Sequence, residues 1–206
     1  MKNNRLLEKS IKIIRFVFVF SVLSVISWLF YKDFVPSGVL EIKNTFKSKS
    51  VLISALYPEN RLRKIEEQGG IYFQTMRIDP IYFDLTIPRF FKTAKVIIKY
   101  QNPSRNLFQI GLKNVDSDWD FLFKTLEDKE KGIALIEKDG WRTAEADFEL
   151  QSWLIKDREL YFILSSPLLY DKQAEIKISE IKIILEKEPW TAENFLPRFK
   201  NYLKNN

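Results

Sequence analysis

The chain has 206 residues, of which 46% are hydrophobic and 15% aromatic, and this is enough apolar material for one domain with a real core. It has no cysteine and no histidine, which excludes disulfides, Cys/His zinc sites, a Ser-His-Asp triad and a Cys-His dyad. The formal net charge is +6, but the excess of basic residues lies near the two ends. A nucleic-acid-binding fold would carry its basic stripe on the body of the domain, so we expect no nucleic-acid partner.

A basic tail, residues 1–15, precedes an uncharged apolar run, residues 16–31. The run extends back to residue 11 if Lys12 and Arg15 snorkel to the lipid headgroups, and it is then long enough to span a membrane. Because the basic flank comes first, the positive-inside rule places the N-terminus in the cytoplasm and the rest of the chain outside. We predict an uncleaved, single-pass signal anchor in the cell membrane. A cleaved signal peptide and a buried helix are the alternatives.

Residues 32–50 have the polar, turn-rich composition of a stalk, and residues 51–190 have the pattern of a β-sandwich ectodomain. Residues 81–87 alternate apolar and polar side chains with period two, which places Tyr82 and Asp84 on the polar face of a strand. The alternation recurs in three further stretches and again near the C-terminus, where its phase slips by one residue, as a β-bulge requires. These stretches are residues 94–100, 107–113, 143–150 and 175–186, with the slip at Ser179 and Glu180.

Gly111 interrupts one of these strands and indicates a bulge or a close approach. Residues 114–132 have the character of a long loop, and residues 191–206 that of a short C-terminal helix. Strands with one apolar face must bury it against a second sheet. We therefore predict a mostly β fold, an antiparallel two-sheet jelly-roll sandwich, preceded by one transmembrane helix and followed by a short C-terminal helix.

Two stretches resemble a known kind of domain. The sequence DPIYFDLTIPRFFKTAKVIIKYQNPSRNLFQIGLK, residues 79–113, resembles a recurrent block in uncharacterised bacterial proteins with one N-terminal span and a jelly-roll ectodomain. The sequence LYFILSSPLLYDKQAEIKISEIKIIL, residues 160–185, resembles the end of the same domain. That domain is similar to galactose-binding-like jelly rolls and carbohydrate-binding modules. The resemblance covers residues 71–185 and implies a binding or structural role; it does not imply an enzyme, and it supplies no ligand residues.

Three tryptophans are the candidate ligand-binding residues, because sugars stack their apolar faces on flat aromatic rings while polar groups orient the hydroxyls. Trp119 and Trp141 fall in predicted loops, and Trp153 falls just after a strand. Tyr82 and Tyr161 fall on the polar faces of predicted strands. The alternative is that these large rings fill the core, since tryptophan is highly buried on average.

An acidic stretch has the spacing of an oxygen-rich calcium loop. Its candidate ligands are Asp116, Asp118, Asp120 and Glu127. The position that normally holds glycine for the sharp turn is Phe121, and the alternative is a solvated acidic loop. We expect no cofactor, with a calcium ion at this stretch as the alternative.

The sequence contains no Gly-rich phosphate loop and no common nucleophile–base arrangement, so we expect no catalytic residue and no enzyme. The first hypothesis is a membrane-anchored, extracytoplasmic binding module that recognises a glycan or another component of the cell envelope. The second is a non-catalytic structural or assembly subunit of an envelope complex, of export or pilus type, that binds protein partners. A shallow aromatic patch favours the first, and a flat apolar patch or an exposed edge strand favours the second.

Overall fold

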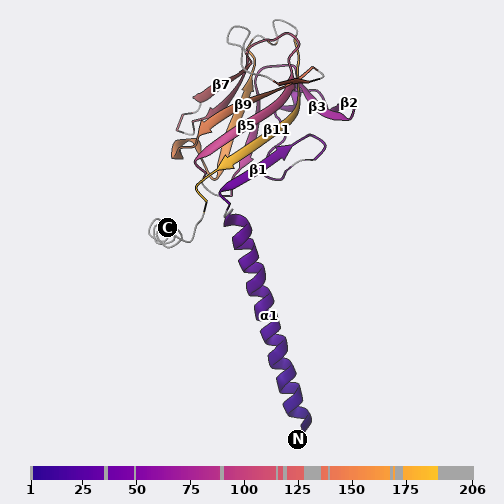
Figure 1. The fold of residues 1–206 in the computed structure, drawn as a ribbon, viewed down its shortest axis with the longest axis vertical. Helices are drawn as coiled ribbons and strands as arrows, with labels where there is room; N and C mark the ends of the chain where they lie inside the picture. The colour runs from indigo at the N-terminus through magenta and orange to yellow at the C-terminus, as the bar shows by residue number, and fades with distance from the viewer. Residues whose placement is uncertain are drawn as a thin grey trace. The chain divides into compact units, whose positions relative to one another are not determined.

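The computed structural model describes residues 2–34, 37–48, 50–88, 91–114, 116–117, 120–127, 136–138, 140–167, 169 and 174–189. The chain forms two compact units, residues 1–36 and residues 37–206. The first contains one helix, α1 (Lys2–Phe34), with no glycine or proline inside it (Figure 1). Within it, Ile11–Leu29 has 19 residues and a mean hydropathy of 2.0, so this segment is long and apolar enough to cross a membrane. Its side chains are exposed throughout.

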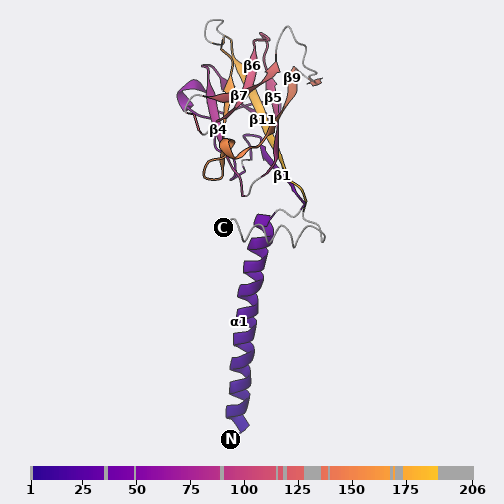
Figure 2. The same ribbon diagram turned by 90° about the vertical axis from the view of Figure 1, so that its left-hand side faces the viewer.

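The second unit is a sandwich of two antiparallel sheets, as predicted. In the described part of the chain the larger sheet, sheet A, has seven strands: β2-β3-β11-β5-β9-β8 in order, with β1 also paired to β11 (Figure 1). Sheet B has four, in the order β4-β10-β6-β7, and forms the other layer in Figure 2. The predicted C-terminal helix lies outside the described residues.

The elements of the two sheets have the following bounds. Sheet A contains β1 (Val39–Asn44), β2 (Glu66–Gln68), β3 (Ile71–Met76), β5 (Thr93–Gln101), β8 (Ile136–Lys138), β9 (Trp141–Glu149) and β11 (Ile176–Glu186). Sheet B contains β4 (Ile81–Thr86), β6 (Phe108–Lys113), β7 (Phe121–Glu127) and β10 (Glu159–Ser165), and two short 3-10 turns are η1 (Glu59–Arg61) and η2 (Ser152–Leu154).

The core lies between the sheets, because each strand sends alternate side chains to its inner face. Strand β5 buries every second residue from Ala94 to Tyr100 in this way. Phe162 of sheet B joins the layers: its ring centroid lies 4.9 Å from that of Phe83 in its own sheet and 6.0 Å from that of Phe148 in sheet A. Aromatic contacts of this kind add to the stabilisation from buried apolar area.

The predicted phase slip in β11 is confirmed as a β-bulge, since the register against β5 shifts between Ile178 and Glu180. The hydroxyl of Ser179 donates a hydrogen bond of 3.3 Å to the carbonyl oxygen of Lys99. The bulge lets β11 keep isoleucines on the inner face on both sides of the slip, although the sequence phase changes there.

Strands β1 and β7 occur where we expected a stalk and a long loop. Within the expected stalk, β1 pairs antiparallel with β11, and Lys43 and Glu41 form cross-strand ion pairs of 3.0 Å and 2.9 Å with Glu180 and Lys182. Within the expected loop, β7 pairs with β6 along its whole length. In β7 the side chains do not alternate between exposed and buried, so period two could not reveal it. In β1 they do alternate, but the strand is short and its buried positions end with the polar residue Asn44.

Candidate ligand-binding face

The outward face of sheet B carries apolar and aromatic side chains where the solvated face of an antiparallel sheet usually carries polar ones. Tyr82 lies opposite Ile163, Ile163 lies opposite Gly111, and Gly111 lies opposite Phe123. We call these four residues, together with Tyr57 described below, the aromatic row. It crosses all four strands of sheet B at right angles to them.

Gly111 is the point where the row is closely packed. A Cβ atom on this residue would lie 2.7 Å from Cγ2 of Ile163 and 3.0 Å from Cε1 of Phe123. The missing side chain therefore lets the Phe123 ring lie against the backbone of β6, and the close approach predicted at Gly111 is confirmed. Phe123 is still 45% exposed, and the ring centroid of Phe121 lies 5.9 Å from its own.

Tyr57 extends the row beyond β4. Its backbone N–H donates to the carbonyl oxygen of Tyr82 at 2.9 Å, and the N–H of Tyr82 donates back at 2.7 Å. The two rings are stacked, with centroids 5.7 Å apart and planes inclined by 25°, and Tyr57 is 37% exposed. From this edge to β7 the row covers four strand spacings, which is about 19 Å.

Two phenol–carboxylate pairs lie beside the row. The hydroxyl of Tyr57 donates to Oδ1 of Asp84 at 2.6 Å, and the hydroxyl of Tyr161 donates to Oε2 of Glu159 at 2.6 Å. Burial, and next the hydrogen bond to Asp84, raises the pKa of Tyr57, while the hydrogen bond to Glu159 is the main reason that the pKa of Tyr161 rises to about 12. Both phenols thus stay protonated, and the carboxylate oxygens beside them can accept hydrogen bonds from hydroxyl groups of a ligand.

The ionisation of Asp84 predicts a pH dependence of stability. Burial is the largest cause that raises the pKa of this carboxyl group, so the folded chain holds its proton more tightly than the unfolded chain does. Asp84 therefore contributes stability at pH values below its unfolded pKa, and this contribution is lost as the pH rises through its folded pKa. Asp84→Asn keeps an oxygen that accepts from Tyr57 but cannot ionise. We expect its free energy of unfolding, measured in urea, to lack the loss that the wild type shows as the pH rises above about 4, the pKa of an unperturbed Asp.

Tyr57→Phe provides the matched comparison. The hydrogen bond from Tyr57 lowers the pKa of Asp84, so its removal should move the loss of stability to higher pH. Equal pH dependence of the wild type and Asp84→Asn would show that this carboxyl group does not contribute as described.

A cleft of about 700 Å³ lies where the edge strand β7 approaches β9, and Trp153 is among the residues that line it. Leu122 and Phe123 line the cleft from β7, so the end of the aromatic row and Trp153 share it. The indole N–H of Trp153 donates to Oε1 of Gln151 at 2.5 Å. Of the two candidate tryptophans in the described part of the chain, Trp141 and Trp153, Trp153 is thus the one placed beside the aromatic row.

The other two candidate tryptophans have different positions. Trp141 is only 7% exposed, its ring centroid lies 5.9 Å from that of Phe73, and Nζ of Lys99 lies 6.0 Å from its ring centroid. It therefore has little open ring surface on which a sugar could stack. Trp119 lies outside the described residues.

The four candidate calcium ligands are not brought together. Glu127 ends β7 and Asp120 precedes it, so an extended strand of about 23 Å separates them. The buried carboxylate of Glu127 accepts a 2.8 Å hydrogen bond from Nδ2 of Asn102 and pairs with Arg142. Asp116 and Asp120 both hydrogen-bond to Asn114, and Asp118 lies outside the described residues.

Among the residues that the structure describes, no group of three or more acidic side chains could hold a metal ion. A calcium ion bound near Asp116, Asp118 and Asp120 stays a prediction, without Glu127 as its fourth ligand.

No family model matches the chain, and no curated protein matches it. Among solved structures, it is similar to the CBM22-1-GH10 modules of Clostridium thermocellum xylanase 10B, with a TM-score of 0.46 and 9% identity over 73% of this chain and 29% of that chain. For the CBM22-1 xylan-binding domain of Paenibacillus barcinonensis Xyn10C, the TM-score is 0.46 and the identity 11%, over 71% of this chain and 94% of that chain. For a family 35 carbohydrate-binding module from Clostridium thermocellum, the TM-score is 0.43 and the identity 9%, over 70% of this chain and 96% of that chain. These likenesses concern the fold alone.

Proposed function

We propose that this chain is a non-catalytic glycan-binding module, held in a membrane by α1 with its sandwich on the extracytoplasmic side. The observation that carries the proposal is the aromatic row on the outward face of sheet B. Hexose rings present flat C–H faces that stack on aromatic rings, and their hydroxyl groups need polar partners at the margin of the stack. Tyr82 and Phe123 supply rings, and Asp84 and Glu159 supply acceptors.

The shape of the row favours an extended glycan over a single sugar. The row crosses four strands and has an exposed ring at each end, Tyr57 at 37% and Phe123 at 45%, whereas a site for one sugar would enclose its ligand on several sides. Two carboxylates next to the row disfavour acidic glycans, since like charges repel across a site of this size. A neutral polysaccharide segment is therefore the ligand class that we propose.

The direct test is a glycan array probed with the full chain in a detergent that has no sugar headgroup. We expect selective binding to neutral oligosaccharides and stronger binding as the oligosaccharide becomes longer. No binding to any glycan, at a protein concentration that saturates a control lectin, would contradict the proposed function.

The edge of sheet B supports a second candidate function, the binding of an envelope protein. Strand β7 has β6 as its partner on one side, and its Leu122 and Phe123 are 42% and 45% exposed. An exposed apolar edge strand is a common site for the addition of a strand from another protein. A photo-crosslinking residue at position 122 that captures one defined membrane protein, together with a blank glycan array, would favour this second function.

The proposed topology predicts a labelling pattern. Because the chain has no cysteine, Ser10→Cys and Glu66→Cys each introduce the sole thiol, on opposite sides of the proposed span. With a membrane-impermeant maleimide on intact cells, we expect labelling at position 66 and none at position 10, as the positive-inside rule requires. Permeabilised cells, in which both thiols should react, are the control. Labelling at position 10 alone in intact cells would reverse the topology.

A further inference from the structure

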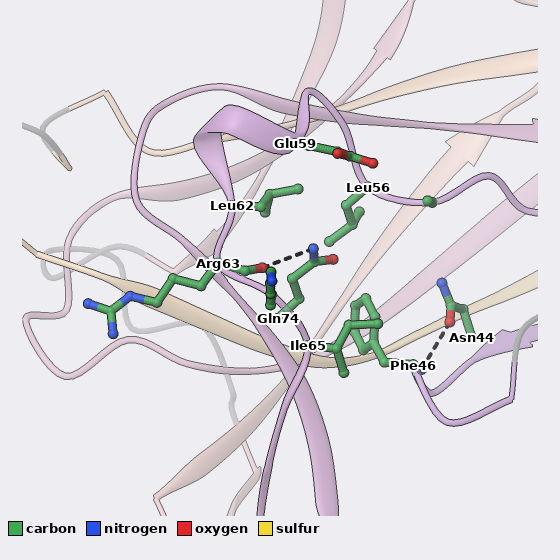
Figure 3. A pocket seen from close by; sticks show the side chains of 10 residues that line it. Asn44, Phe46, Leu56, Glu59, Leu62, Arg63, Ile65 and Gln74 are labelled. Atoms are coloured by element: carbon green, nitrogen blue, oxygen red, sulfur yellow. Dashed lines mark hydrogen bonds between the residues drawn. The ribbon is translucent and has the colours of Figure 1, made fainter.

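A second cavity lies at the edge of sheet A, away from the aromatic row. Strands β1 and β3 both pair with the same edge of β11, and their last pairs are Asn44 with Ile181 and Gln74 with Ile178. Between these pairs lies the bulge in β11, so the two strands do not continue into each other. A pocket of about 570 Å³ opens beside this break, and Asn44 and Gln74 both line it (Figure 3).

Apolar side chains form much of the pocket wall. Phe46 and Ile65 line it below Gln74 in the view of Figure 3, and Leu56 and Leu62 line it above. The side chain of Arg63 points away from the cavity, where Nη2 pairs with Glu175 at 2.5 Å. An apolar wall with a few fixed polar groups is typical of a site for a small molecule.

Two side-chain amides face this pocket with fixed orientations. Oδ1 of Asn44 accepts the backbone N–H of Phe46 at 3.0 Å, which leaves Nδ2 of Asn44 as a donor. Nε2 of Gln74 donates to the carbonyl oxygen of Arg63 at 3.1 Å, which leaves Oε1 of Gln74 as an acceptor. No hydrogen bond from a described residue engages either remaining atom, although Asn44 is only 3% exposed. The amide nitrogen of Asn44 is not among the fully buried atoms, so it can reach a ligand in the pocket, and a ligand oxygen that accepts from it adds a hydrogen bond to the binding free energy.

A ligand that fits this pocket needs a carbonyl oxygen for the donor, an N–H for the acceptor and an apolar group for the wall. A secondary amide that carries a methyl group has all three. We propose that this pocket binds the acetamido group of an N-acetylated amino sugar. Nδ2 of Asn44 donates to the acetamido carbonyl oxygen, and Oε1 of Gln74 accepts the acetamido N–H. The methyl group packs against Phe46 and Ile65, and the sugar ring lies toward the mouth.

The charges around the pocket agree with a neutral ligand. Glu59 and Lys64 both line it, so neither sign of charge prevails, and Arg63 is engaged by Glu175. The pocket shares no residue with the aromatic row, so this inference does not depend on the proposed function. The two sites are distinguished by the sugars they recognise, because a neutral sugar without an amide lacks the N–H and carbonyl pair that this pocket fits.

The test uses the full chain in a detergent without a sugar headgroup, with N-acetylglucosamine, glucosamine and glucose as probes in saturation-transfer NMR. We expect binding of N-acetylglucosamine alone, with the strongest saturation at its acetamido methyl group. Asn44→Asp keeps the oxygen that accepts from Phe46 but removes the donor, so the affinity should fall about tenfold or more. Glu145→Ala, in β9 and outside both the pocket lining and the aromatic row, should leave this binding unchanged.

Ile65→Trp is a second variant that keeps the pocket testable if Asn44→Asp fails to fold. Ile65 is an exposed side chain, so a larger ring there fills the pocket without disturbing the core, and binding of N-acetylglucosamine should be lost. Equal binding of all three sugars, no binding of N-acetylglucosamine, or wild-type binding by a folded variant of either kind would overturn the proposal.

Discussion

Replacing Tyr82 or Phe123 by alanine should lower the affinity for an array-selected neutral oligosaccharide by about tenfold or more in each case. Each ring occupies a central or terminal position of the aromatic row, and truncation of such an anchor typically costs more than about 1 kcal/mol of binding free energy. Isothermal titration of the sandwich alone, residues 37–206, measures the change. The effect should lie mainly in the dissociation rate, since no charge that would steer association is altered.

Two variants serve as controls for the aromatic row. Tyr82→Phe keeps the ring and should bind within about threefold of the wild type, since the stacking surface is retained. Tyr72→Ala removes a tyrosine of β3, in sheet A, and should leave the affinity unchanged. If Tyr82→Ala and Phe123→Ala bind the oligosaccharide as the wild type does, sheet B does not hold the ligand.

Replacing Arg142 by alanine should cost about 3–5 kcal/mol of the free energy of unfolding, because it leaves a buried carboxylate without its counter-charge. Arg142 of sheet A and Glu127 of sheet B form an ion pair between the layers, and both side chains are largely buried. Asn102 donates to the same carboxylate at 2.8 Å and to the carbonyl oxygen of Asn106 at 2.7 Å. Urea unfolding of residues 37–206, followed by tryptophan fluorescence, gives the free energy.

The double variant Arg142→Met with Glu127→Leu separates the cost of a lost pair from the cost of an unpaired charge. It should recover most of the lost stability, because a buried ion pair replaced by apolar side chains of similar volume is often close to neutral. Lys95→Ala removes a partner from two exposed acids, Glu145 and Asp147, and should change the stability by less than about 1 kcal/mol. A urea midpoint for Arg142→Ala equal to that of the wild type would contradict this account.

Period-two alternation was sufficient to predict the central strands. Residues 81–87 and 94–100 lie within or beside β4 and β5, and the phase slip correctly located the bulge in β11. The alternation missed β7 and β1 for two different reasons. In β7 three large apolar residues, 121–123, follow one another, and two of them are exposed. In β1 the partner is β11, at the other end of the sandwich sequence, and no local pattern records that pairing.

The candidate site could be predicted only in part. The polar-face position of Tyr82 and Tyr161 follows from alternation within one strand, and the structure places both on the outward face of sheet B. Their assembly with Tyr57 and Phe123 depends on the order and register of strands far apart in the sequence, which alternation does not fix. The tryptophans were chosen by residue type, and residue type alone does not separate an open ring such as Trp153 from a packed ring such as Trp141.

The pairing of β1 with β11 has a mechanical consequence. Helix α1 ends at Phe34 and β1 begins at Val39, so the connection between them spans at most about 18 Å when fully extended. If the helix is fixed in a membrane while the sandwich is bound to an immobile polymer, a pulling force acts through this short connection on β1 before it reaches any other strand. The hydrogen bonds between β1 and β11 are then the first to bear the load, and their rupture force in a single-molecule pulling experiment sets how much shear the attachment withstands.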